Sequence, residues 1–163
     1  MKQKDPLATS GLPSLDQTVE ENVLGHLEQK SEDPQYLILV ADDSADSVAM
    51  VSLFLQQQGY RVVTASNGED AIKVASQTLP NLILMDISMP TLDGLGATRR
   101  IRDDEQLRHI PVVAVTALGT EGFQRAAYDV GVSGYLTKPI DLDRMSLLIA
   151  RLLSPLGSGN LTS

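Results

Sequence analysis

Five polar residues follow short apolar runs of the sequence, and their side chains suit chemistry on a phosphoryl group. Asp42 and Asp43 follow one apolar run, Asp86 follows a second, and Thr116 and Lys138 follow two later ones. If these runs are strands of one parallel sheet, the five side chains meet at its carboxyl edge. Open α/β sheets bind their ligands at that edge.

The residue types restrict what such a cluster can do. Three carboxylates at close range repel one another, so all of them stay ionised only beside a cation. A hard divalent ion, Mg2+ or the similar Mn2+, suits oxygen ligands of this kind. With the Lys138 ammonium and the Thr116 hydroxyl, it can hold the oxygens of a phosphoryl group. One of the carboxylates can then act as a nucleophile and form an acyl phosphate.

The elements that must position these residues form an alternating pattern of apolar runs and amphipathic segments. Apolar runs of this length predict buried parallel strands, and the intervening segments predict helices on both faces of the sheet. The expected strands are residues 36–41, 61–65, 82–85, 112–115 and 134–136. The expected helices are residues 44–58, 68–77, 92–102, 120–130 and 142–153.

The two ends of the chain differ from this region. Residues 1–34 are predicted to be an N-terminal extension, partly disordered, in which Ser14–Lys30 has the apolar spacing of a short helix. A mostly disordered leader is the alternative for this stretch. Residues 35–154 are predicted to form the domain, and residues 155–163 a flexible tail. After Leu153 only ten residues remain, too few for a separate output module.

Composition excludes several classes of function. The formal net charge of -8 and the lack of a Lys/Arg cluster disfavour direct nucleic-acid binding. There is no cysteine, so thiolate catalysis and disulfides are excluded. No apolar run approaches the roughly 20 residues that cross a bilayer, so we expect no membrane insertion and a cytoplasmic location. A Gly-rich nucleotide-binding loop is also missing, and no cofactor-binding residues are predicted.

Four sequence motifs include the polar residues at the ends of the apolar runs. They are Leu-Val-Ala-Asp-Asp at 39–43, the ten residues from Met85 to Gly94, Val-Thr-Ala at 115–117 and Tyr-Leu-Thr-Lys-Pro at 135–139. These motifs closely resemble the receiver domain of two-component response regulators, and they occur in the order and spacing of that family, over about residues 36–153. The resemblance implies a flavodoxin-like (βα)5 fold, an α/β three-layer sandwich whose parallel five-stranded sheet has the order 2-1-3-4-5.

The resemblance also implies how the acidic cluster works. Asp86 matches the phosphoacceptor of the family. Asp43 matches a direct Mg2+ ligand, and Asp42 helps to hold the metal. Ser88 matches the position whose backbone carbonyl completes the coordination. The metal set is therefore Asp42, Asp43, Asp86 and Ser88.

Further residues match positions of the family that bind the phosphoryl group and transmit the signal. Thr116 and Lys138 resemble the pair that binds the phosphoryl group, and the Lys138–Pro139 bond is similar to one that is cis in the family. Tyr135 matches the aromatic switch, whose ring turns inward when Thr116 moves toward the phosphoryl group. The face at Thr120–Leu153 corresponds to the one that carries the signal to a protein partner.

The implied function is that of a stand-alone response regulator in a two-component system or phosphorelay. A sensor histidine kinase or a histidine phosphotransfer protein would supply the phosphoryl group. The domain is not expected to be an enzyme, although it assists its own phosphorylation and dephosphorylation. Two alternatives stay open: a protein-interaction module independent of phosphorylation, and the receiver portion of a larger hybrid kinase.

Some residues have a simpler interpretation. Asp42 and Asp43 could cap the following helix, although Ser44 suffices for that. His26 and His109 are expected at the surface, away from any metal site. Arg99, Arg100 and Arg102 are expected on a solvated helix face.

Overall fold

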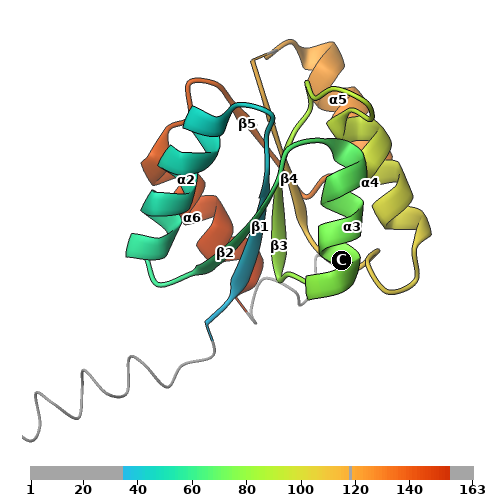
Figure 1. Ribbon diagram of the computed structural model, residues 1–163. Coiled ribbons are helices and arrows are strands. Elements are labelled where there is room, and N and C mark those ends of the chain that lie inside the picture. Colours follow the sequence, from blue (N-terminus) through green and yellow to red (C-terminus); the bar gives the residue numbers. More distant parts are fainter. Residues whose placement is uncertain (1–34, 118, 155–163) are drawn as a thin grey trace, which may run out of the picture. The chain divides into compact units, whose positions relative to one another are not determined.

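The computed structural model describes residues 35–117 and 119–154, and within them five parallel strands form one sheet (Figure 1). The order across the sheet is β2-β1-β3-β4-β5, which confirms the predicted order 2-1-3-4-5. The strands are β1 (Leu37–Ala41), β2 (Arg61–Ala65), β3 (Leu82–Asp86), β4 (Val112–Thr116) and β5 (Gly134–Thr137). The expectations for Ser14–Lys30 and for residues 155–163 concern parts of the chain outside the described residues.

Five helices alternate with these strands, as predicted. They are α2 (Ala45–Gln57), α3 (Gly68–Thr78), α4 (Gly94–Asp103), α5 (Glu121–Val130) and α6 (Leu142–Leu153). In Figure 1, α2 and α6 cover one face of the sheet, and α3, α4 and α5 cover the other. Among the described residues no helix has the length and apolar character that crossing a bilayer requires.

Three strands run one residue further than the apolar pattern predicted. The parallel ladder continues through the first polar residue of each, since Asp86 pairs in register with Val115, and Thr116 pairs with Thr137. The consequence is that Asp86 and Thr116 belong to the rigid edge of the sheet instead of to flexible loops.

The core lies in two layers, one on each face of the sheet. Successive residues of a strand point to opposite faces, so Leu39 packs in one layer and Ile38 in the other, both fully buried. Ala97 and Ile101 of α4 close the first layer, and Met145 of α6 helps to close the second. Burial on both faces explains why the strand sequences are continuous apolar runs.

Each helix begins just past the carboxyl end of a strand, where a polar side chain caps its free backbone N–H groups. Ser44, for example, accepts a hydrogen bond from the Ser47 N–H at 3.3 Å. The other caps are Asn67, Asp93, Thr120 and Asp141. Because Asp93 is a cap, α4 starts at Gly94, two residues later than predicted.

Gly94 lets α4 approach the strand that carries Asp86. Its N–H donates to the Ile87 carbonyl at 3.0 Å. A Cβ at this position would overlap with the Asp86 backbone oxygen and lie 2.8 Å from the Ile87 Cα. Neither backbone atom can turn aside as a flexible side chain would. The absence of a side chain at this position therefore keeps the Asp86 loop close against the helix.

We expect Gly94→Ala to lower the free energy of unfolding by about 1–3 kcal/mol, the usual cost of overpacking. Gly122→Ala is the matched control, because nothing lies within 4 Å of a Cβ at that helical position. The control should gain about 0.5–1 kcal/mol from its better helix propensity. Urea denaturation followed by circular dichroism measures both; equal stability of Gly94→Ala and wild type would contradict the close-packing argument.

Arg102 corrects one sequence-based expectation, because it does not lie on a solvated face. Its guanidinium donates to the carbonyls of Gly131 at 2.8 Å, Arg108 at 3.0 Å and Ile110 at 2.8 Å. Burial lowers the pKa of Arg102. The side chain thus ties the end of α4 to the end of α5 and to the loop before β4. Arg99 and Arg100 are exposed, as predicted.

Candidate functional site

A lysine and two aspartates form the centre of the candidate site at the carboxyl edge of the sheet. The Lys138 Nζ lies 3.0 Å from Asp42 Oδ2 and 3.1 Å from Asp86 Oδ2. Asp42 follows β1, Asp86 is the last residue of the adjacent strand β3, and Lys138 follows β5. The ammonium thus reaches across the end of β4 to join residues that are far apart in sequence. The Lys138–Pro139 bond is cis, as the resemblance implied.

Backbone hydrogen bonds fix the other oxygen of each carboxylate. Asp42 Oδ1 accepts from the Ser44 N–H at 2.8 Å, and Asp86 Oδ1 accepts from the Ser88 N–H at 3.0 Å. Both aspartates are buried, with 7% and 3% of their surface exposed. Each therefore has a set orientation, with one oxygen held by the loop that follows its strand and the other held by Lys138.

A third carboxylate completes an acidic cluster. Asp43 is exposed, and one oxygen from each of Asp42, Asp43 and Asp86 lies within 4.8 Å of the other two. With one ammonium beside three carboxylates, the cluster keeps an excess of negative charge. Carboxylate oxygens are the ligands that Mg2+ prefers, so the residues present fit such an ion.

Burial and charge shift the acid–base behaviour of this cluster. Burial raises the pKa of Asp86, assisted by the nearby charge of Asp42, and this outweighs the hydrogen bonds from Ser88 and Lys138. Burial acts to lower the pKa of Lys138, but its bonds to the two carboxylates prevail and the pKa is raised. Lys138 therefore stays charged, while the ionised form of Asp86 is disfavoured in the absence of a further cation.

This shift predicts a pH dependence of stability in protein treated with a chelator. Because the pKa of Asp86 is raised by folding, the native state binds more protons than the unfolded state above about pH 4. Its contribution to the free energy of unfolding therefore falls as pH rises through the shifted pKa. Asp86→Asn lacks this contribution, so its stability relative to wild type should increase with pH in urea titrations. A relative stability that decreases with pH would contradict the shift.

Thr116 and Tyr135 lie beside this centre on the last two strands. Thr116 is fully buried, and its carbonyl accepts from the Lys138 N–H at 2.8 Å. Tyr135 is 6% exposed. Burial raises the pKa of Tyr135, and a hydrogen bond with the Thr116 side chain acts in the opposite direction. A continuous set of contacts therefore leads from the acidic cluster through Thr116 to Tyr135.

The comparison with known proteins identifies this arrangement. A family model described as the response regulator receiver domain matches residues 38–150. The chain belongs to this family. Receiver domains take part in two-component signalling, interact with histidine kinases and downstream targets, and bind Mg2+ at an acidic pocket.

Individual relatives agree with this assignment. The response regulator PleD of Caulobacter vibrioides is 42% identical over 104 residues, which cover 64% of this chain but only 23% of PleD. The polar-differentiation response regulator DivK of Brucella anthropi is 35% identical over 107 residues, 66% of this chain and 87% of DivK. This chain thus spans most of DivK but less than a quarter of PleD.

A solved structure extends the comparison to the site. The receiver domain of sensor histidine kinase PA1611 from Pseudomonas aeruginosa has a TM-score of 0.69 and 31% identity, over 74% of this chain and 98% of that one. It is described with a magnesium ion coordinated in the active site cleft. That ion belongs to the PA1611 domain.

The receiver domain brings together the side chains that the sequence singled out. Asp42, Asp43, Asp86 and Lys138 form one cluster, and Thr116 lies at the end of the intervening strand. The contact of Ser88 with this cluster runs through its backbone N–H, while its side chain is exposed. Sequence reasoning missed the structural role of Arg102, since nothing in its spacing distinguishes it from its exposed neighbours.

Proposed function

We propose that this receiver domain accepts a phosphoryl group on Asp86 in a Mg2+-dependent reaction and signals to a protein partner. The observation that carries the proposal is the placement of Lys138 Nζ between Asp42 and Asp86, next to the third carboxylate of Asp43. An isolated structural ion pair would not need two more acids of the same sign beside it. A site that receives a divalent ion and an anionic phosphoryl group does.

Each residue of the site has its own role in the proposed phosphoryl transfer. An Asp86 carboxylate oxygen attacks the phosphorus atom; the bond from phosphorus to the donor breaks, and an aspartyl phosphate forms. The donor is a phosphohistidine of a sensor kinase or phosphotransfer protein. Lys138 and the Thr116 hydroxyl then bind phosphoryl oxygens. The protein thus takes part as the acceptor and assists its own phosphorylation and dephosphorylation, without turning over a separate substrate.

The metal would be held by the carboxylates of Asp42, Asp43 and Asp86 and by the Ser88 carbonyl. Mg2+, or Mn2+ in its place, would supply positive charge that neutralises the phosphoryl oxygens. The excess of negative charge in the cluster supports this assignment.

The signal would be a shift between two conformations of the domain. Thr116 ends β4, beside the strand that carries Asp86, and its side chain hydrogen-bonds to Tyr135. A phosphoryl group that draws Thr116 toward it would therefore change the contacts of the ring. Tyr135 also lies next to α5 and α6, within the Thr120–Leu153 face proposed for the downstream partner. We further propose that residues 35–154 act as a stand-alone regulator in the cytoplasm, with residues 1–34 and 155–163 as extensions.

The test is the intact mass of the protein after incubation with acetyl phosphate, with either Mg2+ or a chelator. We expect a gain of one phosphoryl group in Mg2+ and none with the chelator. A purified histidine kinase with its own phosphohistidine serves as a second donor. If neither donor changes the mass, the domain is a binding module independent of phosphorylation, and the proposal is wrong.

A further inference from the structure

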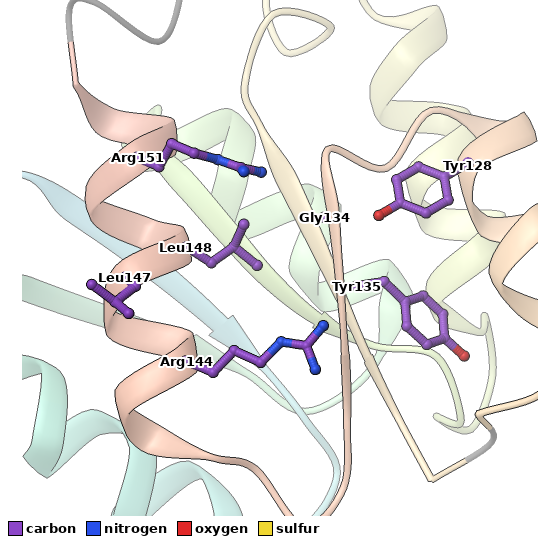
Figure 2. A pocket seen from close by; sticks show the side chains of 7 residues that line it. All are labelled: Tyr128, Gly134, Tyr135, Arg144, Leu147, Leu148 and Arg151. Atoms are coloured by element: carbon purple, nitrogen blue, oxygen red, sulfur yellow. The ribbon is translucent and has the colours of Figure 1, made fainter.

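The start of α3 contacts the loop that joins Asp86 to α4. The Gly68 N–H, at the first residue of α3, donates to the Leu92 carbonyl at 3.0 Å. Leu92 belongs to this loop, residues 87–93. Because α3 follows β2, the contact lies on the β2 side of the sheet, whereas the groove in Figure 2 lies on the other side, between α5, β5 and α6. The contact is therefore separate from the face proposed for the partner.

The loop contains a strained turn at Thr91. Its φ of 71° lies in the left-handed region, which a β-branched residue rarely adopts. The Leu92 N–H donates to the Pro90 carbonyl at 2.8 Å, which closes a three-residue turn around Thr91. A three-residue turn with a positive φ at its centre is rare and strained. Such strain persists only where the surrounding structure imposes it. Other contacts of the loop must therefore hold the turn in place.

Two glycines lie against Leu92, the residue that follows this turn. A Cβ on Gly68 would overlap with the Leu92 carbonyl oxygen and lie 2.9 Å from the carbonyl carbon. A Cβ on Gly96 would lie 2.7 Å from the Leu92 Cδ1. The Leu92 side chain also packs against one layer of the core. The main chain of Leu92 is thus seated on α3, and its side chain is seated on α4.

The start of the loop is fixed as well. The Ile87 N–H donates to the Val115 carbonyl at 3.0 Å, and the Ile87 carbonyl accepts from the Gly94 N–H at 3.0 Å. Met89 is buried in the core. Ser88, whose carbonyl is proposed as a metal ligand, therefore lies in a short segment with both ends anchored.

We propose that Gly68 is a positioning residue for the metal site, because its contact with Leu92 sets the place of the Ser88 carbonyl. Between these two loop residues, Pro90 has a fixed φ and Thr91 is already strained, so a displacement of Leu92 is passed on to Ser88. Mg2+ demands near-ideal octahedral geometry, so a displaced ligand costs affinity. The inference rests on the proposed function, which makes Ser88 a ligand.

The test is the affinity of Gly68→Ala for Mn2+ alone, measured from the electron paramagnetic resonance signal of the free ion. The added Cβ should displace Leu92 and weaken binding about tenfold, a usual effect of losing a group that orients metal ligands. Asp43→Asn removes a proposed ligand and shows which part of the binding belongs to this site. No phosphodonor is present, so the measurement does not depend on phosphorylation.

Competition of Mg2+ and Ca2+ against Mn2+ separates positioning from general damage. Ca2+ tolerates irregular coordination and Mg2+ does not, so Gly68→Ala should lose more affinity for Mg2+ than for Ca2+. Gly59→Ala is the control. Gly59 has a φ of 96°, and nothing lies within 4 Å of a Cβ there, so alanine strains the backbone after α2 without touching the loop. This variant should lose stability but keep wild-type affinity for Mn2+.

A second substitution tests the turn itself. Thr91→Gly removes the steric penalty of the left-handed conformation, so the turn can adjust when Leu92 moves. The double variant Gly68→Ala/Thr91→Gly should therefore recover most of the lost affinity. Thermal unfolding must show that each variant folds. If Gly68→Ala does not, Leu92→Ala replaces it with the same expected loss, because it loosens the same anchor without adding an atom.

Four results would overturn the inference. They are unchanged Mn2+ affinity in the folded variant, equal losses for Mg2+ and Ca2+, an equal loss in Gly59→Ala, and no recovery with Thr91→Gly. Intact mass separates this inference from the proposed function. A mass gain of wild type with unchanged Mn2+ affinity of Gly68→Ala refutes the positioning alone. Weakened Mn2+ binding by Gly68→Ala, with no mass gain of wild type from either donor, refutes the phosphoacceptor alone.

Discussion

Asp86→Asn is expected to lose all phosphoryl acceptance while it keeps the native fold. Asparagine has nearly the same shape, and its side-chain oxygen can still accept the Ser88 N–H that now bonds to Asp86 Oδ1. It lacks the carboxylate that would attack phosphorus. Intact mass after incubation with acetyl phosphate and Mg2+ should show a phosphoryl group on wild type and none on the variant.

The control for this experiment is another aspartate, changed in the same way. Asp103 is exposed at the last residue of α4, away from the cluster, so Asp103→Asn should gain a phosphoryl group as wild type does. Circular dichroism and thermal unfolding should show Asp86→Asn to be folded. A phosphoryl group on Asp86→Asn would mean that another residue is the acceptor, and tandem mass spectrometry would locate it.

Lys138→Ala is expected to separate phosphorylation from its consequences. Without the ammonium, Asp42 and Asp86 lose the charge that both now contact. We expect the free energy of unfolding without Mg2+ to fall by about 1–3 kcal/mol, less than for a fully buried pair, because Lys138 is 27% exposed. In Mg2+ the variant should still accept a phosphoryl group on Asp86. The group then lacks the contact that would position it against Thr116, so Tyr135 should no longer respond.

Nuclear magnetic resonance of fluorotyrosine-labelled protein follows that response. The chain has four tyrosines and no tryptophan, and Tyr135→Phe identifies the signal of interest. Wild type with acetyl phosphate and Mg2+ should shift the Tyr135 signal, and phosphorylated Lys138→Ala should not. Lys73→Ala removes an exposed lysine of α3 and should behave as wild type. If phosphorylation shifts the Tyr135 signal of Lys138→Ala as much as that of wild type, Lys138 has no role in transmitting the signal.

Much of the fold was predictable because it depends on local pattern. The continuous apolar runs predicted buried parallel strands, and the caps and helix-length segments predicted what lies between them. The sequence pattern predicted that β3, β4 and β5 end one residue earlier than they do in the structure. Apolarity stops at Asp86 and Thr116, but ladder hydrogen bonds are made by the backbone and continue through a polar residue.

The chemistry of the cluster was likewise predictable from residue types and their places after strands. Parallel strands bring their carboxyl ends to one edge, so Asp42, Asp86 and Lys138 had to come near one another once the order of strands was known. The resemblance supplied the roles of Ser88 and Tyr135, which residue type alone does not reveal. Those roles stay proposals for the experiments above.

The sequence by itself thus determined the fold class, the order of the elements and the composition of the acidic cluster, since these follow from hydrophobic period and residue type. Only the tertiary structure decided which contacts are made. It placed the Lys138 ammonium on both carboxylates, bonded the half-buried Arg102 guanidinium to three carbonyls, and left Arg144 and Arg151 without acidic partners among the described residues. The physical reason is that a charged side chain has the same sequence signature whether it is solvated, paired or buried. Its state depends on which groups other segments bring within a few ångströms.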